Sequence, residues 1–391
     1  MKIRDEVYLD GAANAPIDKD VLKAMKPFLT NGFVGNSQSV HDYGIAAHIA
    51  VEDARHDVAA VIGVPEDNII FTSGATEGNN WVIKMTAFKK SFIDNEIPHI
   101  ICGALEHDSI TNACKQLEEF KYNVTYVTPK EGGKLHFSDI EPYIRLSTCL
   151  ICISSVNNEL GVYNDAEDIA KKAGNLGIKT LVDCTQSVGY GGSSINLKEL
   201  FPSATYMTFS AHKIYGPTGV GVLICKPEDR PMPLINAGSQ EFGRRGGTSN
   251  TAGIVGTAAA VVKMAQSDSY TDHYVYLYNY LYNKMVWELP GVKMNVVPDQ
   301  KNIISLDCSR VCNYDKLASV LGTQEIAVAG GSACTEEVDE TQGGFNGSHV
   351  LLGLGLSEKQ IRNTIRISFT RYTTAKDIDK LIHTIKEVEN R

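Results

Sequence analysis

No apolar run in this sequence is long enough to cross a membrane. The longest such runs, for example residues 150–156, have the length of one strand, whereas a spanning helix needs about 20 apolar residues. The first ten residues mix charged and apolar side chains and lack the apolar centre of a secretory signal peptide. We therefore expect a soluble, cytoplasmic protein, in the cytosol or an equivalent reducing space.

An excess of positive charge is also missing. Lys and Arg number 37 against 46 Asp and Glu, which gives a formal net charge of -9 at pH 7. Nucleic acids and anionic membranes bind basic surfaces, so we expect neither as a direct partner. Hydrophobic residues make up 43% of the chain and charged residues 21%, a balance typical of a soluble globular protein.

The cysteines lack the spacings of a disulfide framework or a zinc site. There are nine, an odd number, scattered over a long chain. Cys149 and Cys152 form a C-x-x-C, but they lie in an apolar segment that predicts a buried strand, and no second pair completes a zinc site. Cys308 and Cys312 are interpreted as packing at a strand end. We expect no bound metal.

The pattern along the chain predicts two domains of the α/β class. From about residue 45 to 265, short apolar strands alternate with helical patterns, which indicates a largely parallel sheet. The expected strands are 68–72, 99–105, 150–156, 179–183, 206–210 and 220–225. After about residue 265 the pattern changes to a smaller α+β arrangement. We predict a large domain of residues 17–265 and a small domain of residues 1–16 and 266–391.

Segments that follow the expected strands carry residues suited to a phosphate and a charged ring. Ligands of parallel sheets bind at the carboxyl ends of the strands. Residues 69–78 form a strand, a small-residue turn and a helix start, where the N–H groups of Ala75 and Thr76 suit a phosphate, although an ordinary capped helix gives the same pattern. Asp183 ends an apolar strand, where it either caps a helix or pairs with a protonated pyridine nitrogen.

Lys213 lies between a strand and a Gly-Pro break, so it projects from a rigid position. A lysine there can form a Schiff base with pyridoxal 5'-phosphate, and Ser210 and His212 are placed to contact the phosphate. A lone lysine in a loop is usually a solvated charge. Its combination with the phosphate turn and Asp183 favours a pyridoxal-phosphate site.

With these motifs in place, the chain resembles the cysteine desulfurases of the class V aminotransferase group, which are fold-type-I pyridoxal-phosphate enzymes. The resemblance runs nearly end to end, and several motifs in order carry more weight than any one of them. The matching motifs are residues 8–10, 72–77, 106–107, 156–161, 183–186, 210–213, 243–248, 331–335 and 365–366.

The resemblance implies how the cofactor ring is held. Lys213 would bind the cofactor covalently, and Asp183 would pair with the pyridine nitrogen. Gln186 would hydrogen-bond the ring oxygen. His107 would stack on the ring face and help to move protons.

The resemblance also implies contacts to the phosphate and the substrate. The phosphate contacts would be Ala75, Thr76, Ser210 and His212. Thr248 would reach the phosphate bound in the neighbouring subunit, which implies a homodimer. Asn158 and Arg366 would hold the carboxylate of L-cysteine, and a bidentate Arg–carboxylate pair would orient the Cα–H bond for proton removal.

Cys334 would be the residue that receives the sulfur. It opens a segment rich in glycine and acidic residues, which we expect to be exposed and mobile, as a travelling nucleophile requires. L-cysteine would become L-alanine, with His107 as the acceptor of the thiol proton. The persulfide on Cys334 would pass to an acceptor protein, for iron–sulfur cluster assembly, tRNA thiolation or cofactor synthesis.

Three other activities fit part of the pattern. A selenocysteine lyase shares this machinery and would differ in its preference for selenocysteine. Another lyase or aminotransferase of the same group would not need Cys334. An inactive scaffold of the same fold would purify without cofactor, although every expected catalytic position is filled in this sequence.

Overall fold

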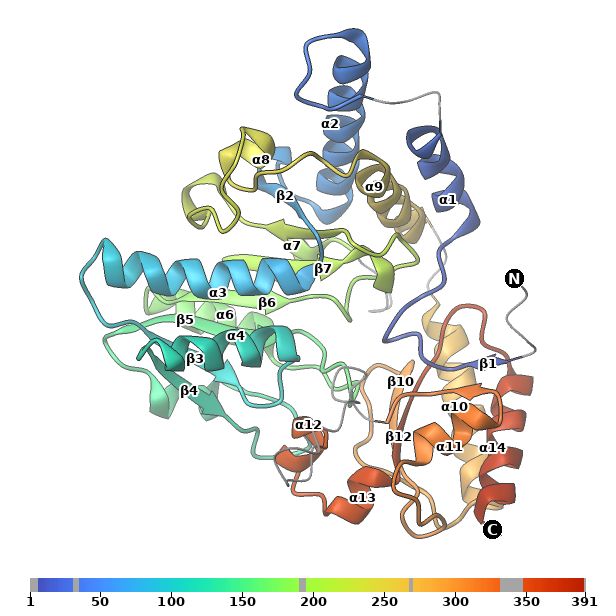
Figure 1. The fold of residues 1–391 in the computed structure, drawn as a ribbon. Helices are drawn as coiled ribbons and strands as arrows, with labels where there is room; N and C mark the ends of the chain where they lie inside the picture. Colours follow the sequence, from blue (N-terminus) through green and yellow to red (C-terminus); the bar gives the residue numbers. More distant parts are fainter. Residues whose placement is uncertain (1–5, 31–34, 190–194, 267–269, 331–346, 390–391) are drawn as a thin grey trace.

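The structure is a computed structural model that describes residues 6–30, 35–189, 195–266, 270–330 and 347–389. The chain folds into a larger lobe built on a twisted sheet and a smaller lobe beside it (Figure 1). Strand β1 (Val7–Tyr8) and helix α14 (Ala375–Glu389), near the two ends of the described chain, lie together in the smaller lobe. In the part of the chain described, no helix is long and apolar enough to cross a membrane.

A seven-stranded sheet forms the middle of the larger lobe. Its strands are β2 (Ile69–Thr72), β3 (His99–Gly103), β4 (Asn123–Val127), β5 (Thr148–Ser154), β6 (Lys179–Asp183), β7 (Tyr206–Ser210) and β8 (Gly221–Ile224). Their order is β2-β8-β7-β6-β5-β3-β4, and within it β8 is the strand that runs antiparallel to its neighbours. The predicted α/β fold with a mostly parallel sheet is therefore confirmed.

Helices cover both faces of this sheet. The long helices are α2 (Asp42–Ile62), α3 (Ala75–Phe92), α4 (Asp108–Glu119), α6 (Ala166–Asn175) and α9 (Thr251–Gln266). Alternate residues of each strand point to opposite faces. On β3, Ile100 belongs to the core that includes residues of α3 and α4, whereas Ile101 belongs to the core that includes residues of α2, α6 and α9. Burial on both faces explains why the central strands read as continuous apolar runs, Cys149 and Cys152 among them.

The smaller lobe has its own sheet and core. Strands β9 (Lys293–Met294), β10 (Ile303–Asp307) and β12 (Thr364–Ser368) form an antiparallel sheet in the order β12-β10-β9. Its core joins this sheet to helices α10 (Thr271–Glu288), α11 (Leu317–Thr323) and α14. Cys308 and Cys312 are buried in it. β1 pairs with β11 (Ile326–Ala327), and Val7 and Leu9 join the same core.

These two cores support a division of the chain that we propose, with a large domain of residues 17–265 and a small domain of residues 1–16 and 266–391. Some packing crosses the division: Ala15 packs in the core of the larger lobe, and a small apolar cluster joins Leu105 and Leu160 to Leu351 and Ile361. The remaining helices are short: α1 (Lys19–Met25), α5 (Phe137–Ile140), α7 (Leu197–Leu200), α8 (Gln240–Gly243), α12 (His349–Gly353) and α13 (Glu358–Arg362).

Strand β4 is an element that the sequence analysis did not predict. It lies at the edge of the large sheet and is only partly buried along most of its length. An edge strand buries little apolar surface, so its sequence, Asn-Val-Thr-Tyr-Val, lacks the continuous apolar run of its neighbours.

Candidate active site

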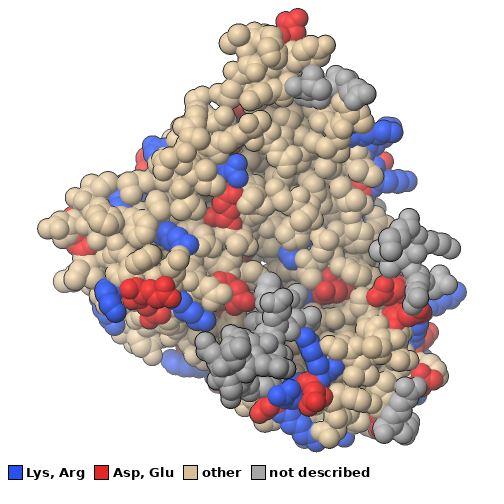
Figure 2. All heavy atoms as spheres, in the orientation of Figure 1, with Lys and Arg blue, Asp and Glu red and all other residues tan. Residues whose placement is uncertain are grey.

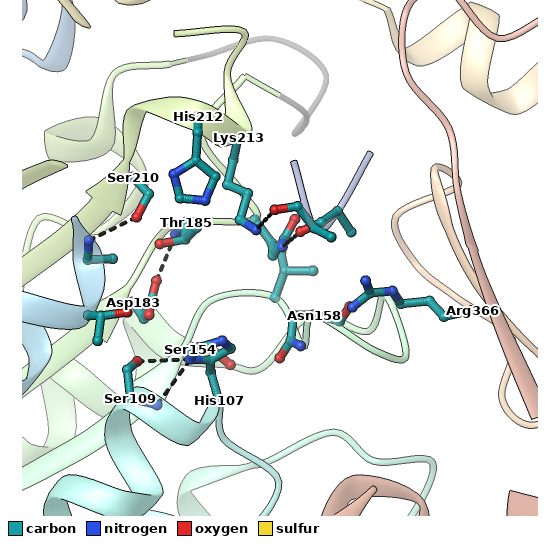
Figure 3. A pocket seen from close by; sticks show the side chains of 16 residues that line it. His107, Ser109, Ser154, Asn158, Asp183, Thr185, Ser210, His212, Lys213 and Arg366 are labelled. Carbon is teal, nitrogen blue, oxygen red and sulfur yellow. Dashed lines mark hydrogen bonds between the residues drawn. The ribbon is translucent and has the colours of Figure 1, made fainter. Parts of the chain in front are cut away.

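A cavity of about 260 Å³ opens at the carboxyl ends of β5, β6 and β7 and reaches β12 of the smaller lobe. Figure 3 shows side chains from both lobes pointing into it. Ten residues predicted from the sequence line this one cavity: Ala75, Thr76, His107, Asn158, Asp183, Gln186, Ser210, His212, Lys213 and Arg366. The lining runs from Ala12 to Arg366, so segments up to 354 positions apart meet here, and those that follow β5, β6 and β7 do so because the parallel strands end at one edge of the sheet.

One end of the cavity has the chemistry of a phosphate site. Helix α3 begins there at Ala75, and its first N–H groups have no partner within the helix. Ala75 N donates to Ser210 Oγ at 2.8 Å, which ties the helix start to the end of β7. A Cβ at Gly221 would lie 2.5 Å from Gly74 Cα, so glycine is required where β8 passes this turn. The positive end of a long helix dipole suits an anion.

Asp183 lies at the other end, buried, with both carboxylate oxygens held. Oδ2 accepts from Asn79 Nδ2 at 2.7 Å, and Oδ1 accepts from Thr185 N at 2.9 Å. Both donors are neutral, so the charge of the buried carboxylate calls for a cationic partner on its cavity side. A protonated pyridine nitrogen is such a partner, and the fit supports the predicted role of Asp183.

His107 is the N-cap residue of α4, and its ring lies in the cavity wall. Ser109 N donates to His107 Nδ1 at 3.1 Å, and Ser109 Oγ lies 2.9 Å from the same atom. Burial lowers the pKa of His107, against the opposing charge of Asp183, so the ring is neutral at neutral pH. Since Nδ1 accepts an N–H, the neutral ring carries its proton on Nε2.

This tautomer changes one prediction. We expected His107 to accept the thiol proton of Cys334, but a neutral ring with its proton on Nε2 donates at that atom. We therefore revise the expectation for the resting enzyme: His107 offers a proton to the cavity. The neighbouring His212 is also neutral, because burial lowers its pKa to about 4, helped by the charge of Lys213.

Lys213 ends a short 3-10 turn that directly follows β7. Its Nζ donates to the carbonyl oxygen of Ala13 at 2.5 Å. Gly216 packs against this turn so closely that a Cβ would lie 2.8 Å from the oxygen of Ala211. The lysine is therefore presented from a rigid turn, as the sequence predicted, with its amine directed at the N-terminal segment that closes the cavity (Figure 3).

Only one of the two polar atoms of the Gln186 amide has a hydrogen-bond partner among the described residues. Nε2 donates to Ala12 O at 3.0 Å, whereas the buried Oε1 has no partner among the described residues. Thr185 Oγ1 is a second buried oxygen of this kind. Buried polar atoms are normally hydrogen-bonded, so these two indicate a polar ligand in the cavity. The contact of Gln186 with a ring oxygen stays a prediction.

Arg366 projects from β12 into the same cavity, with its side chain only 2% exposed. Nη1 donates to Asn158 O at 3.0 Å and Nη2 donates to Asp10 Oδ1 at 2.9 Å. Its Nε is buried and has no partner within the described chain. A substrate carboxylate would supply one, as predicted for Asn158 and Arg366 together.

Two predicted residues lie elsewhere. Thr248 is exposed and lines a separate small hollow with Gly219 and Arg245, so it does not line the cavity described above. Cys334 falls in residues 331–346, outside the described residues.

The structure adds residues that the sequence analysis missed. Ser154 and Thr185 line the cavity just where β5 and β6 end, so the rule that ligands bind at strand ends would have found them. Asn79 contacts Asp183 from inside α3, and Asp10 contacts Arg366 from the N-terminal segment. No local sequence pattern marks Asn79, because the hydrogen-bond partner of an amide within a helix is set by the tertiary structure.

Comparison with known proteins identifies the family of the chain. The model of the family Aminotransferase class-V matches residues 7–381. Cysteine desulfurase IscS of Buchnera aphidicola subsp. Acyrthosiphon pisum (strain 5A) is 37% identical over 392 residues, covering 99% of this chain and 92% of the relative. A solved structure described as a NifS-like protein has a TM-score of 0.85 at 29% identity, covering 98% of this chain and 99% of its own. Another, SspA in complex with cysteine, has a TM-score of 0.76 at 31% identity, covering 94% and 99%.

Proposed function

Because the chain belongs to the cysteine desulfurases of the family Aminotransferase class-V, we propose that its cavity takes sulfur from L-cysteine and leaves it on Cys334 as a persulfide. The enzyme depends on pyridoxal 5'-phosphate. The observation that carries the proposal is the single cavity that joins an anion site at α3, the buried carboxylate of Asp183, the amine of Lys213 and the unpartnered Nε of Arg366. That set matches a phosphate, a pyridine nitrogen, an aldehyde and an amino-acid carboxylate in turn.

Different residues of the chain would hold different parts of the cofactor. Ala75, Thr76 and Ser210 would hold the phosphate with the start of α3, next to neutral His212. Asp183 would keep the proton on the ring nitrogen. Pyridoxal phosphate, once bound, supplies an electron sink for the charge left when the Cα proton of the substrate is removed. Lys213 would bind the cofactor covalently, and once the amine of the substrate has displaced it, its freed Nζ would take that proton.

Arg366 and Asn158 would orient the substrate, since a carboxylate held by the guanidinium fixes the direction of the Cα–H bond. The sulfur atom of the substrate then bonds to the sulfur of the Cys334 thiolate while the substrate C–S bond breaks. The three-carbon skeleton takes up protons and leaves as L-alanine. The net change is L-cysteine plus a thiol giving L-alanine plus a persulfide. His107, with its proton on Nε2, is placed to supply one of these protons.

We further propose a homodimer in which Thr248 serves the partner's cavity. Its exposure outside the cavity of its own protomer supports this. Apolar side chains are exposed on α1, just before α2 and along the first half of α2: Leu22, Val40, Tyr43, Ile45 and Ile49. Figure 2 shows few charged side chains over α2 and α9 on the same part of the molecule. An apolar, weakly charged surface of this kind suits a subunit interface.

The sulfur acceptor is proposed only by its chemistry. A protein persulfide passes its outer sulfur to a thiolate, so we expect a partner protein with a reactive cysteine, working in iron–sulfur cluster assembly or tRNA thiolation. A free thiol at Cys334 persists best in a reducing compartment, so we propose that the reaction takes place in the cytoplasm. Acidic and basic side chains are interspersed on the face shown in Figure 2.

The decisive test counts products of the purified enzyme with L-cysteine. The wild type should release L-alanine and carry one labile sulfur on Cys334. Cys334→Ala should stay yellow and lose alanine formation. Cys312→Ala, at a buried cysteine of the smaller lobe, is the matched control and should keep both products. Alanine formation that survives Cys334→Ala would move the enzyme to another lyase or aminotransferase of the family, and a strong preference for selenocysteine would make it a selenocysteine lyase.

A further inference from the structure

Asn79 lies one turn into α3, behind the cavity wall, with no exposed surface. It makes three side-chain hydrogen bonds. Nδ2 donates to Asp183 Oδ2 at 2.7 Å and to Ser109 Oγ at 2.9 Å. Oδ1 accepts from Thr208 Oγ1 at 2.6 Å. A buried amide with every polar atom in use has one orientation available to it.

The direction of each hydrogen bond follows from its chemistry. An ionised carboxylate only accepts, so the nitrogen of the Asn79 amide faces Asp183. Both hydrogens of Nδ2 are then used, one on Asp183 and one on Ser109 Oγ. Thr208 uses its hydroxyl hydrogen on Oδ1, which prevents the amide from turning over.

Ser109 links the oriented amide of Asn79 to the ring of His107 by hydrogen bonds. Its Oγ accepts from Asn79, so its own hydrogen is available to His107 Nδ1, 2.9 Å away. The backbone N–H of Ser109 donates to the same ring nitrogen. Nδ1 therefore accepts the backbone N–H with its one lone pair, which the Ser109 hydroxyl can share, and the ring proton is held on Nε2. Figure 3 shows Asp183 and the Ser109–His107 pair along one side of the cavity.

We propose that Asn79 is a positioning residue that couples Asp183 to His107 and sets both for the cofactor ring. This inference rests on the proposed function for the identity of the ring, but the chain of hydrogen bonds does not depend on it. Asp183 would meet the ring nitrogen and His107 the ring face. One buried amide therefore fixes the direction of the carboxylate and, through Ser109, supports the tautomer in which His107 donates to the cavity.

The test uses 15N-histidine NMR of the protein in its cofactor-free and cofactor-loaded forms. In the wild type, His107 should show an unprotonated, hydrogen-bonded Nδ1 and a protonated Nε2, with His107→Gln used for assignment. In Asn79→Leu the Nδ1 signal of His107 should move toward that of a more weakly hydrogen-bonded nitrogen, although residue 79 does not touch the ring. Ser109→Ala should move it in the same direction. This second variant removes only a hydroxyl, so it keeps the test valid if Asn79→Leu does not fold.

The kinetic readout separates positioning from binding. Asn79→Leu should lower kcat roughly ten- to hundredfold, the loss expected when a hydrogen bond to a charged group is removed, while KM for L-cysteine stays within about threefold. Asn363→Leu is the matched control, since Asn363 is equally buried and bonds to Tyr314 and Lys359 in the smaller lobe. It should leave the His107 signal unchanged.

Two results would overturn the inference. One is a wild-type His107 with its proton on Nδ1. The other is an unchanged Nδ1 signal in both Asn79→Leu and Ser109→Ala. A wild-type protein that shows the predicted signals but makes no alanine from cysteine would instead refute the proposed function and leave the hydrogen-bond chain intact.

Discussion

Arg366 and Asp10 form an ion pair between residues 356 positions apart in the chain, with Nη2 2.9 Å from Oδ1. Asp10 belongs to the N-terminal segment and Arg366 to β12. The pair, together with the bond from Nη1 to Asn158 O, holds the guanidinium at the edge of the cavity, where Nε has no partner among the residues that the structure describes. Asp10 therefore orients the group that we propose to bind the substrate carboxylate.

Asp10→Asn should weaken substrate binding without loss of the cofactor. The amide keeps the size of the side chain but removes the charge that orients Arg366. We expect KM for L-cysteine to rise about tenfold, with a smaller change in kcat. Arg366→Lys keeps the charge but loses the planar fork, and should lower kcat/KM by at least about 100-fold. Steady-state kinetics on the yellow enzymes measures both, and an unchanged KM in Asp10→Asn would contradict the orienting role.

Lys213→Ala should abolish covalent attachment of the cofactor. Borohydride reduction followed by mass spectrometry should find the cofactor on the Lys213 peptide of the wild type and on no peptide of the variant. Alanine formation should fall by at least about 10³-fold, because the variant also lacks the base for the Cα proton. Lys226→Ala, at an exposed lysine beyond β8, should behave as the wild type. Reduction onto a different lysine in the wild type would remove Lys213 from the mechanism.

Glu106 should make the stability of the fold fall as pH rises. Burial raises its pKa from 4.5 to about 8, and the charge of Asp183 acts in the same direction. Between these values the unfolded chain releases the proton while the folded chain keeps it, so the free energy of unfolding falls through this window and the contribution is lost above about pH 8. The side chain is 3% exposed, so the effect should be on the order of a few kcal/mol.

Glu106→Gln does not titrate and should lose this pH dependence. We would measure urea unfolding at several pH values between 5 and 8.5 (about one pH unit apart). The free energy of unfolding of the variant should rise relative to that of the wild type as pH rises. Glu119→Gln, at an exposed position on helix α4, which begins two residues after Glu106, should follow the wild-type slope. Parallel curves for the wild type and Glu106→Gln would show that the Glu106 carboxyl is ionised in the folded protein.

Mixed dimers should reveal whether Thr248 acts across the subunit interface. Thr248→Glu would repel the phosphate, and Lys213→Ala lacks the attachment lysine, so each variant alone should be inactive. In a hybrid, one cavity carries both defects and the other carries neither. Equal mixing with subunit exchange should therefore restore about a quarter of wild-type activity. No recovery in verified hybrids would place the defect of Thr248→Glu within its own protomer.

Much of the site was predictable because it follows strands. Asp183 ends β6, Lys213 follows β7, and Ala75 begins the helix after β2, so alternation of strands and helices was enough to expect them at one edge of a sheet. Their identity as one cofactor site came from the resemblance of ordered motifs. The same logic missed β4, whose edge position removes the apolar run that marks a buried strand.

The sequence by itself determined the fold class, the family and the residue types that we propose to meet the cofactor, because strand spacing and motif order are local properties of the chain. Only the tertiary structure decided how those residues are held. The pairing of Arg366 with Asp10, the contact of Asn79 with Asp183 and the proton on His107 Nε2 depend on directions of hydrogen bonds between segments brought together by folding. A hydrogen bond is directional over about 3 Å, and the order of residues along the chain carries no information at that scale.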